Sequence, residues 1–435
     1  MTAPATRNPA LALLDRLFRT AVAAAHPSGC LPAHLPQPPA NGRLIILAAG
    51  KAAGSMIETA ERHYLHGLRL ARDRLTGLAV TRHGYGRPAE LIEVVEAGHP
   101  VPDAAGLAAA ERTLQLADQA TAVDLVLVLL SGGASANWTA PADGIAFADK
   151  QALTRAMLRS GANITEINAV RKHLSRIKGG RLALRAQPAR VVTLAISDVP
   201  GDDPAVIGSG PTVPDPATLD DARAVLARHR IEVPAAIARA LADPKSETPK
   251  PSHPAFASTS YQLVARPADA FRSAEAAVRA AGYDCIMLGD RIEGEARAVA
   301  AEHAARAIGL QRQGQRAVLL SGGELTVTIR GQGRGGPNQE YALALAMALQ
   351  GAPGIAALAA DTDGTDGGAG SASDPAGAVA DDGTLARATA LGLDPAKFLA
   401  ENDSTSFFEQ IGDLVMTGPT CTNVNDFRAI VVDRP

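Results

Sequence analysis

Aromatic side chains are scarce in this chain of 435 residues: Phe, Trp and Tyr together make up 3% of it. Glycine is frequent, with 41 residues. Small side chains must therefore form much of the contact between helices and sheets, which favours α/β packing. Because the length exceeds what a single hydrophobic core usually supports, we expect two domains.

The sequence also lacks a strong excess of charge, with 42 Lys and Arg against 45 Asp and Glu. This balance argues against a nucleic-acid or membrane-surface partner, so any basic site must be local. The three cysteines, Cys30, Cys285 and Cys421, form no CxxC pair, which predicts a reducing compartment. No apolar run reaches the roughly 18–20 residues of a membrane span, and we expect a cytoplasmic protein.

Two similar glycine-rich segments stand out among what is present. In Arg316–Glu340, an apolar run leads into Ser321–Glu324, which we predict to be a turn, and then into a glycine-rich loop that carries Arg334. Earlier in the chain, the apolar run Leu125–Leu130 leads into Ser131–Ser135. Glycines let backbone N–H groups approach an anion, and an arginine offers a planar fork for a carboxylate or phosphate. The two segments therefore predict an anionic ligand.

A third strand-to-glycine junction lies near the N-terminus, after a first helix predicted over Pro9–Ala25. The apolar run Arg43–Ala49 predicts a buried strand, and Gly50–Gly54 and the helical pattern Ser55–Leu65 follow it directly. Lys51 is placed to meet a phosphate at the start of that helix, although an exposed lysine is an equally good interpretation. The spacing is neither that of a Walker A loop nor that of the dinucleotide fingerprint GxGxxG.

The middle of the chain carries a basic segment and an aspartate after a strand. Ile164–Ala186 has helical spacing and a polar face with five basic side chains, which is either solvated or functional. Asp198 follows the predicted strand Arg190–Ile196, where ligands bind in α/β sheets, although it also fits a simple turn. Ala242–Ser260, rich in Pro, Ser and Lys, predicts a boundary loop.

The last third repeats the alternation of strand and helix. Helical spacing predicts Ala268–Ala281, Glu293–Leu310 and Tyr341–Leu349. A strand over Ile355–Ala360 leads into Asp361–Gly367, whose alternating aspartates resemble the start of a calcium loop, but the glutamate of an EF-hand is missing. Such a loop also suits a hydroxyl-bearing substrate or Mg²⁺.

Taken together, these motifs resemble those of the two-domain glycerate 2-kinase family, whose C-terminal part is the MOFRL domain. The resemblance extends from about the first helix to the last strand. The motifs that carry it are Gly50-Lys51, Ser131-Gly132-Gly133, Lys172–Ser175 with Lys178–Arg181, Ser197–Val199 with Gly208–Thr212, Gly294–Arg297, Gly333–Gly336 with Asn338–Glu340, Asp361–Gly367, and Thr417–Thr420 with Asn423–Asp426.

The resemblance implies an α/β protein with a Rossmann-like doubly wound sheet in an N-terminal domain and a mixed α/β C-terminal domain. The expected boundaries are residues 1–245, a linker over 246–260, and residues 261–435 with the MOFRL region at about 315–430. The active site is expected in the cleft between the two domains. The expected partner is the small molecule D-glycerate. Whether the protein forms a homodimer is left open at this point.

The activity that the resemblance implies is phosphorylation of D-glycerate at its 2-hydroxyl by ATP with Mg²⁺. The alternative is an NAD(P)H-dependent hydroxypyruvate reductase, a label often given to such proteins, but the missing dinucleotide fingerprint favours the kinase. The implied catalytic residues are Lys51, Asp198 and Arg334, with Asp198 either positioning the hydroxyl group or binding Mg²⁺. The implied nucleotide- or phosphate-binding residues are Gly50, Ser131, Gly132, Gly133, Ser135, Lys172, Ser209, Gly210 and Thr212. The implied substrate-binding residues are Ser321, Gly322, Gly323, Glu324, Asn338, Asp361, Asp363 and Asp366.

Overall fold

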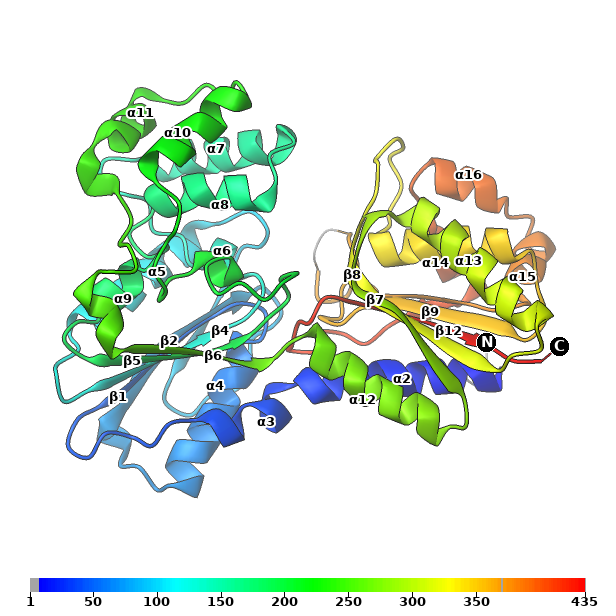
Figure 1. The fold of residues 1–435 in the computed structure, drawn as a ribbon, viewed down its shortest axis with the longest axis horizontal. Helices are drawn as coiled ribbons and strands as arrows, with labels where there is room; N and C mark the ends of the chain where they lie inside the picture. Colours follow the sequence, from blue (N-terminus) through cyan, green and yellow to red (C-terminus); the bar gives the residue numbers. More distant parts are fainter. Residues whose placement is uncertain (1–7, 369–370, 435) are drawn as a thin grey trace. The chain divides into compact units, whose positions relative to one another are not determined.

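The computed structural model describes residues 8–368 and 371–434, and it contains two compact units. The N-terminal unit is Cys30–Val264. The C-terminal unit combines the described part of Met1–Gly29 with that of Ala265–Pro435. Each unit is a six-stranded sheet with helices on both faces, which confirms the predicted α/β class (Figure 1). Within the described ranges, no helix combines the length and hydrophobicity needed to cross a membrane.

The sheet of the N-terminal unit has the strand order β3-β2-β1-β4-β5-β6, the order of dinucleotide-binding Rossmann folds. Strands β1 to β5 pair in parallel. β1 and β4 are buried along their whole length, as expected from runs that are apolar at every position. The predicted Rossmann-like sheet is therefore confirmed. The strands are β1 (Leu44–Ala49), β2 (Leu75–Arg82), β3 (Glu93–Ala97), β4 (Leu125–Leu130), β5 (Arg190–Ile196) and β6 (Thr259–Ala265).

Helices cover both faces of this sheet. α4 (Ala53–Glu61) lies on one face, and α5 (Ala104–Asp118) and α9 (Arg181–Arg185) lie on the other (Figure 1). α5 begins where the sequence predicts, because the side chain of Asp103 accepts a hydrogen bond from the backbone N–H of Gly106 at 2.9 Å. The return of the chain to opposite faces after β1 and β4 creates a switch point between these two strands.

A separate helical layer lies beyond α5 in the same unit. It consists of α7 (Phe147–Arg159), α8 (Ile164–His173), α10 (Leu219–Arg228) and α11 (Ala235–Ala242), which share their own apolar core. The prediction of one helix over Ile164–Ala186 is wrong. α8 ends at His173, and Gly179 and Gly180, with φ of 58° and 81°, turn the chain into α9.

The sheet of the C-terminal unit is mixed, as predicted, with the order β11-β10-β9-β12-β8-β7. β12 pairs antiparallel with β8 and β9, whereas β7 and β8 are parallel. The strands are β7 (Asp284–Glu295), β8 (Ala317–Thr326), β9 (Ile355–Asp361), β10 (Gly377–Ala380), β11 (Leu414–Val415) and β12 (Asp426–Val432).

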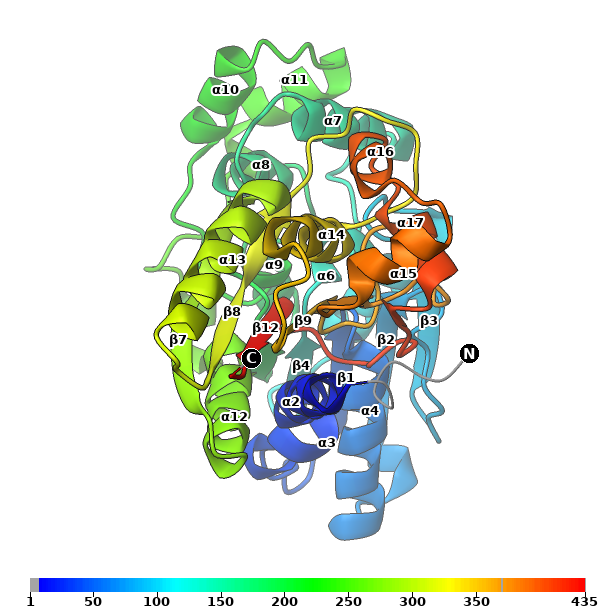
Figure 2. The ribbon, with the colours of Figure 1, turned by 90° about the vertical axis from the view of Figure 1, so that its right-hand side faces the viewer.

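The helices of this unit come from both ends of the chain. α2 (Pro9–Ala25), which matches the predicted first helix, packs beside α12 (Pro267–Ala280) on one face of the sheet (Figure 2). Phe18 of α2 meets Phe427 of β12 edge to face, and Phe271 of α12 stacks on the same ring. On the other face lie α13 (Ala296–Arg312), α14 (Pro337–Leu349), α15 (Thr384–Ala390), α16 (Pro395–Ala400) and α17 (Ser404–Ile411).

Two predicted domain boundaries differ from the compact units. The first helix belongs to the C-terminal unit rather than to residues 1–245, because its apolar face completes the core around Phe427. Residues 246–260, the predicted linker, lie inside the N-terminal unit and lead into β6. Polar contacts such as the buried hydroxyl of Thr248 fix this segment, and polar contacts leave no periodic pattern in a sequence.

The predicted turn at Ser321–Glu324 is also wrong. Ser321, Gly322 and Gly323 continue β8, and β7 extends beside them to Glu295 across two register shifts. A Cβ atom on Gly322 would lie 2.4 Å from the ring of Phe271, and one on Gly323 would lie 2.2 Å from the carbonyl oxygen of Ile292. These glycines therefore permit close packing within a sheet rather than a turn.

We predict that Phe18→Ala destabilises the C-terminal unit by about 3–5 kcal/mol, because it leaves a cavity beneath an aromatic cluster. The control is Arg19→Ala, which removes a neighbouring side chain that is 67% exposed. Urea denaturation of the full chain measures both. Equal midpoints for the two variants would contradict the assignment of α2 to this core.

Candidate active site

Two loops interlock at the switch point between β1 and β4. The backbone N–H of Lys51 donates to the carbonyl oxygen of Gly132 at 2.8 Å, and the N–H of Ala52 donates to Ser131 Oγ at 2.9 Å. Gly50 has a φ of 115°, and a Cβ atom there would lie 2.4 Å from Ser131 Oγ. Only glycine, which has no Cβ atom, allows the two loops to come this close at position 50. The structure thus brings the predicted residues Gly50, Lys51 and Ser131 together.

Gly133 marks the open side of this junction. It has a φ of 87°, and a Cβ atom there would lie 3.1 Å from His99 Cδ2 and 3.3 Å from Lys51 Cγ. In the described part of the chain, the backbone N–H groups of Gly132 and Gly133 have no hydrogen-bond acceptor. Backbone donors beside a lysine form a concavity that suits an anion, and α/β sheets bind ligands at such switch points.

Serine side chains line the continuation of this loop. The short helix α6 (Ala134–Asn137) begins after Gly133, and Ser135 Oγ lies 2.7 Å from Ser209 Oγ. Ser209 also donates to Asn168 Oδ1 at 3.0 Å. Ser209 and the neighbouring Gly208 and Gly210 all have positive φ, so this segment is a tight turn against α6. Ser135, Ser209 and Gly210 therefore lie around the short helix that follows Gly133, next to the junction that carries Lys51.

Three cations lie close to one another near these serines: Lys150 and Lys178 are buried, and Arg171 is half-buried. Lys178 Nζ donates to the carbonyl oxygen of Ser135 at 2.6 Å, and Lys150 Nζ donates to that of Leu174 at 2.9 Å. Burial, and then the charges of Lys150 and Arg171, hold the pKa of Lys178 well below its usual value. Burial and Arg171 likewise lower the pKa of Lys150 to about 7. Among the described residues, these three side chains have no carboxylate partner within ion-pair distance.

Such a cluster is unfavourable unless an anion joins it, because each positive charge raises the free-energy cost of keeping the neighbouring side chains charged. Sequence reasoning missed Lys150, Lys178 and Asn168 as site residues. The continuous helix predicted over Ile164–Ala186 hid the turn that aims Lys178 at Ser135. The one available signal was the glycine pair that follows Lys178, because a helix rarely continues through two glycines.

Two other predicted phosphate-binding residues lie outside this group. Lys172 forms a buried ion pair with Asp215, with Nζ 3.0 Å from Oδ1. The hydroxyl of Thr212 is 2.7 Å from that of Thr193 in β5, and both side chains are buried. The structure gives both residues internal partners, and their roles in phosphate binding stay predictions.

Asp198 follows β5 at the same edge of the sheet as Ser131. It is half-buried, and its charge and those of Asp202 and Asp203 contribute to raising the pKa of Tyr261, after the larger effect of burial. The charges of these three carboxylates are thus felt at the Tyr261 hydroxyl. Among the described residues, no group of three or more His, Cys, Asp or Glu side chains is arranged to hold a metal ion.

In the C-terminal unit, most predicted substrate-binding residues form a buried network. Asp366 accepts hydrogen bonds from the backbone and side chains of Asn338 and Gln339, at the start of α14. Burial raises the pKa of Asp366 to about 7. Asn338 also donates to Asp426, which pairs with Arg428 at 2.9 Å. This arrangement holds α14 on the sheet.

The remaining predicted residues of this unit have mixed surroundings. Arg428 donates to the Gly322 carbonyl and to Ser321 Oγ, so these two residues are engaged inside the sheet. The carboxylates of Asp361 and Asp363 accept hydrogen bonds from within their own loop. Glu324 is exposed. Arg334 is exposed as well, and its guanidinium pairs with Glu409 at 2.8 Å.

The fold and the loop contacts define the class of protein: a two-unit α/β protein with a glycine-rich loop junction at the switch point of a Rossmann-order sheet. A family model described as a domain of unknown function, DUF4147, matches residues 13–242. The model of the MOFRL family matches residues 317–426.

Characterised relatives identify the family. The chain is 39% identical over 392 residues to the D-glycerate 2-kinase of Thermotoga maritima, covering 88% of this chain and 89% of that protein. The crystal structure of a glycerate kinase from that organism has a TM-score of 0.84 and 37% identity, covering 98% of this chain and 100% of that one. A protein of Agrobacterium vitis, provisionally named hydroxypyruvate reductase, is 45% identical over 426 residues. The match covers 97% of this chain and 94% of that protein. The chain belongs to the glycerate 2-kinase family.

We predict that Lys150→Met flattens the dependence of stability on pH. The pKa of Lys150 is about 7 in the folded protein and 10.5 in its usual state. Between these pH values the unfolded chain holds a proton on Lys150 that the folded protein lacks, so stability rises with pH in this window. The wild type should gain up to about 1.4 kcal/mol per pH unit more than the variant. Urea denaturation at pH 7.5 and 9.5 measures the difference. Lys397→Met, which changes a side chain that is 82% exposed, is the control, and parallel curves for Lys150→Met and the wild type would refute the prediction.

Proposed function

We propose that the protein is a D-glycerate 2-kinase, which transfers the γ-phosphoryl group of ATP to the 2-hydroxyl of D-glycerate. The observation that supports this most is the junction of Lys51 with the N–H groups of Gly132 and Gly133, backed by buried cations without carboxylate partners. Phosphoryl transfer requires mainly positioning and charge neutralisation, and this junction offers both.

In the proposed reaction, the 2-hydroxyl oxygen of glycerate forms a bond to the γ-phosphorus while the bond to the bridging oxygen of ADP breaks. Lys51 and the two backbone N–H groups neutralise the phosphoryl oxygens as charge builds up on them. Asp198 either accepts the proton of the hydroxyl group or holds Mg²⁺. Both roles fit its place after β5, on the edge of the sheet that carries Ser131.

We propose Mg²⁺ as the metal ion that accompanies ATP. This ion is usually held by one or two carboxylates together with phosphate oxygens and water, so a three-residue protein site is not required. Asp198, Asp202 and Asp203, in the loop after β5, offer carboxylates of the required kind. When bound, Mg²⁺ would neutralise charge on the phosphates.

Arg334 is proposed to bind an anionic group of the substrates, either the glycerate carboxylate or the phosphoryl group. Its side chain is 63% exposed, and its partner Glu409 is 60% exposed. Exposed ion pairs are worth only about 0–1 kcal/mol, so a substrate anion can replace Glu409 at little cost. The planar guanidinium fits a carboxylate with two parallel hydrogen bonds.

A hydroxypyruvate reductase is the second candidate, since the strand order is also that of dinucleotide-binding folds. The loop after β1 weighs against it. That loop reads Gly50–Gly54 without the GxGxxG spacing, and the N–H of Ala52 is already bonded to Ser131. β2 ends at Thr81 and Arg82 rather than at the acidic residue that binds the ribose of NAD.

The direct test measures ADP release from ATP with D-glycerate in a coupled assay, followed by identification of the phosphorylated carbon. We expect D-glycerate-dependent ADP release and a product phosphorylated at carbon 2. Hydroxypyruvate with NADH or NADPH is tested in parallel. Oxidation of the nicotinamide without ADP release from glycerate would overturn the proposal.

We predict that Lys51→Ala and Arg334→Ala each lower turnover by roughly a hundredfold, since one contact to a transferring phosphoryl group is commonly worth about 3 kcal/mol. The control for the first is Arg72→Ala, which removes an exposed charge at the opposite end of the parallel strands from Lys51. The control for the second is Glu409→Gln, which removes the charge of the ion-pair partner of Arg334. Steady-state kinetics compares all four. Near-normal turnover of Lys51→Ala or Arg334→Ala would refute the role of that residue.

A further inference from the structure

A cavity with a cationic wall lies in the N-terminal unit, apart from the junction at Lys51. It has a volume of about 390 Å³ and opens between α11, the turn before α9 and the loop that precedes α7. None of Lys51, Ser131–Ser135 or Ser209 lines it. Its charged wall consists of Arg176, Arg181, Arg239, Lys245, Asp143 and Asp243.

Arg181 is the central cation of this wall. Its Nη2 donates to the backbone carbonyls of Ser246 and Glu247 at 2.6 and 3.2 Å, which are neutral acceptors. Its Nε is buried and has no hydrogen-bond partner among the described residues. Burial lowers the pKa of Arg181, and the nearby charges of Glu247 and Asp215 oppose this effect. Arg181 as a whole is half-buried, and a guanidinium that donates only to neutral carbonyls keeps its charge available to an anion.

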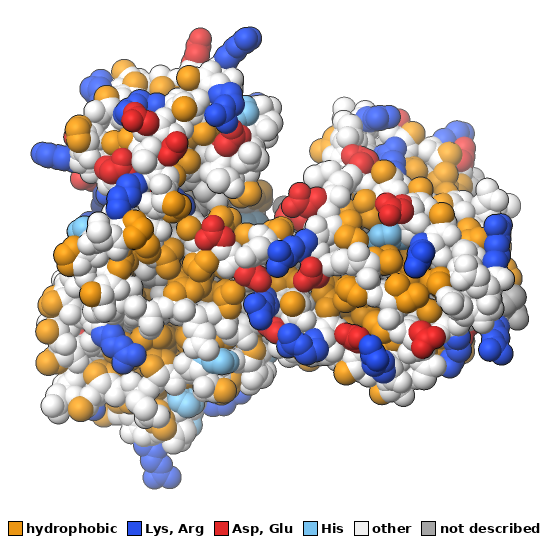
Figure 3. Space-filling view, viewed as in Figure 1, with side chains coloured by type: hydrophobic (Ala, Val, Ile, Leu, Met, Phe, Trp, Pro, Cys, Tyr) orange, Lys and Arg blue, Asp and Glu red, His pale blue; other side chains and the backbone are white. Residues whose placement is uncertain are grey.

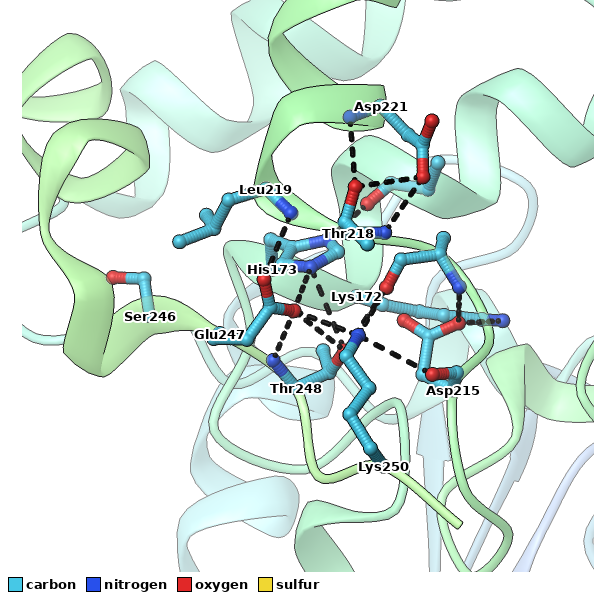
Figure 4. Close-up of polar contacts among 12 residues, drawn as sticks. Lys172, His173, Asp215, Thr218, Leu219, Asp221, Ser246, Glu247, Thr248 and Lys250 are labelled. Carbon is cyan, nitrogen blue, oxygen red and sulfur yellow. Dashed lines mark hydrogen bonds and ion pairs between the residues drawn. The ribbon is translucent and has the colours of Figure 1, made fainter.

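The carboxylates closest to Arg181 are already engaged (Figure 4). Asp215 pairs with Lys172 through Oδ1, whereas its buried Oδ2 has no hydrogen-bond partner among the described residues. Burial alone would raise the pKa of Glu247, but its hydrogen bonds lower it to about 2. These bonds come from the backbone of Leu219 and Thr248 and from the side chains of His173 and Lys250. Figure 4 shows the side chain of Ser246, which lines the cavity, pointing away from this network.

The rest of the wall leaves positive charge in excess. Arg176 is matched by Glu111 and by Asp143, whose side chain is 94% exposed. Asp243 then remains as one carboxylate against three cations, Arg181, Arg239 and Lys245. Asp243 also caps the turn at Lys245, whose backbone N–H donates to Oδ1 at 2.9 Å. Arg239 and Lys245 are exposed, and neither has a carboxylate partner in the described part of the chain.

Charged side chains of both signs cover the surface over α10 and α11, whereas the face around β6 is mainly uncharged (Figure 3). The excess of positive charge is therefore a property of the cavity wall rather than of the whole layer. The volume lies within the range of about 300–1,000 Å³ that is typical of small-molecule sites.

We infer that this cavity binds a phosphate monoester of a small organic molecule, at a site distinct from the proposed phosphoryl-transfer site. A dianionic phosphate matches the surplus of charge, and its three terminal oxygens suit two guanidinium groups and one ammonium. Arg181 holds the base of the site, and Arg239 and Lys245 close over the ligand from α11 and from the turn that follows it.

The test is calorimetric titration of the full chain with inorganic phosphate and with glycerol 3-phosphate, at a constant 150 mM NaCl to screen non-specific attraction. Glycerol serves as the uncharged probe. The double variant Arg239→Gln/Lys245→Gln removes two exposed cations of the wall, so the fold should stay intact. Arg228→Gln, on the exposed surface of α10, is the matched control. Lys51→Ala reports on phosphate bound at the proposed active site.

The wild type, Arg228→Gln and Lys51→Ala should all bind glycerol 3-phosphate, and the double variant should bind it at least tenfold more weakly. Glycerol should show no heat of binding. Equal affinity for the double variant and the wild type would overturn the inference, and so would complete loss of binding in Lys51→Ala. D-glycerate-dependent ADP release by the double variant is measured separately, so failure of this site and failure of the kinase proposal remain distinguishable.

Discussion

The contact between the loops after β1 and β4 is the constraint on which the N-terminal unit depends. Two backbone hydrogen bonds join Lys51 and Ala52 to the Ser131–Gly132 turn, and Gly50 leaves no space for a side chain between them. Both loops are fixed to each other, and the N–H groups of Gly132 and Gly133 have no acceptor among the described residues. Rigid backbone donors of this kind stabilise charge without reorganising when a substrate arrives.

Buried cations add to this junction a charge that the overall composition hides. The chain as a whole is slightly acidic, yet Lys150, Arg171 and Lys178 gather where carboxylates are missing. Their mutual repulsion lowers the stability of the free protein, and the proposed anion would relieve it. The cavity at Arg181 follows the same principle, since the carboxylates nearest to that guanidinium are bound to other groups.

The C-terminal unit uses its polar residues differently. Asp366, Asn338, Asp426 and Arg428 satisfy one another inside the core and fix the start of α14, so motifs that resemble ligand-binding loops hold the fold together. Arg334 remains exposed on a loop, with a partner that it can exchange. Residues of one motif list thus differ in their surroundings: some are engaged inside the core, and Arg334 is exposed, with an ion-pair partner on the surface.

The sequence by itself determined the α/β class, the two sheets, the first helix and most strands, because apolar runs and helical spacing are local signals. It also predicted that Lys51 and the Ser131 loop act on an anion, since glycines after buried strands have a local meaning. Only the tertiary structure decided that the first helix packs with the C-terminal unit, that Ser321–Gly323 lies inside β8, and that Lys172 pairs with Asp215. Each of these depends on contacts between residues far apart in the chain, such as Phe18 with Phe427, and no local pattern specifies which distant partner a side chain meets.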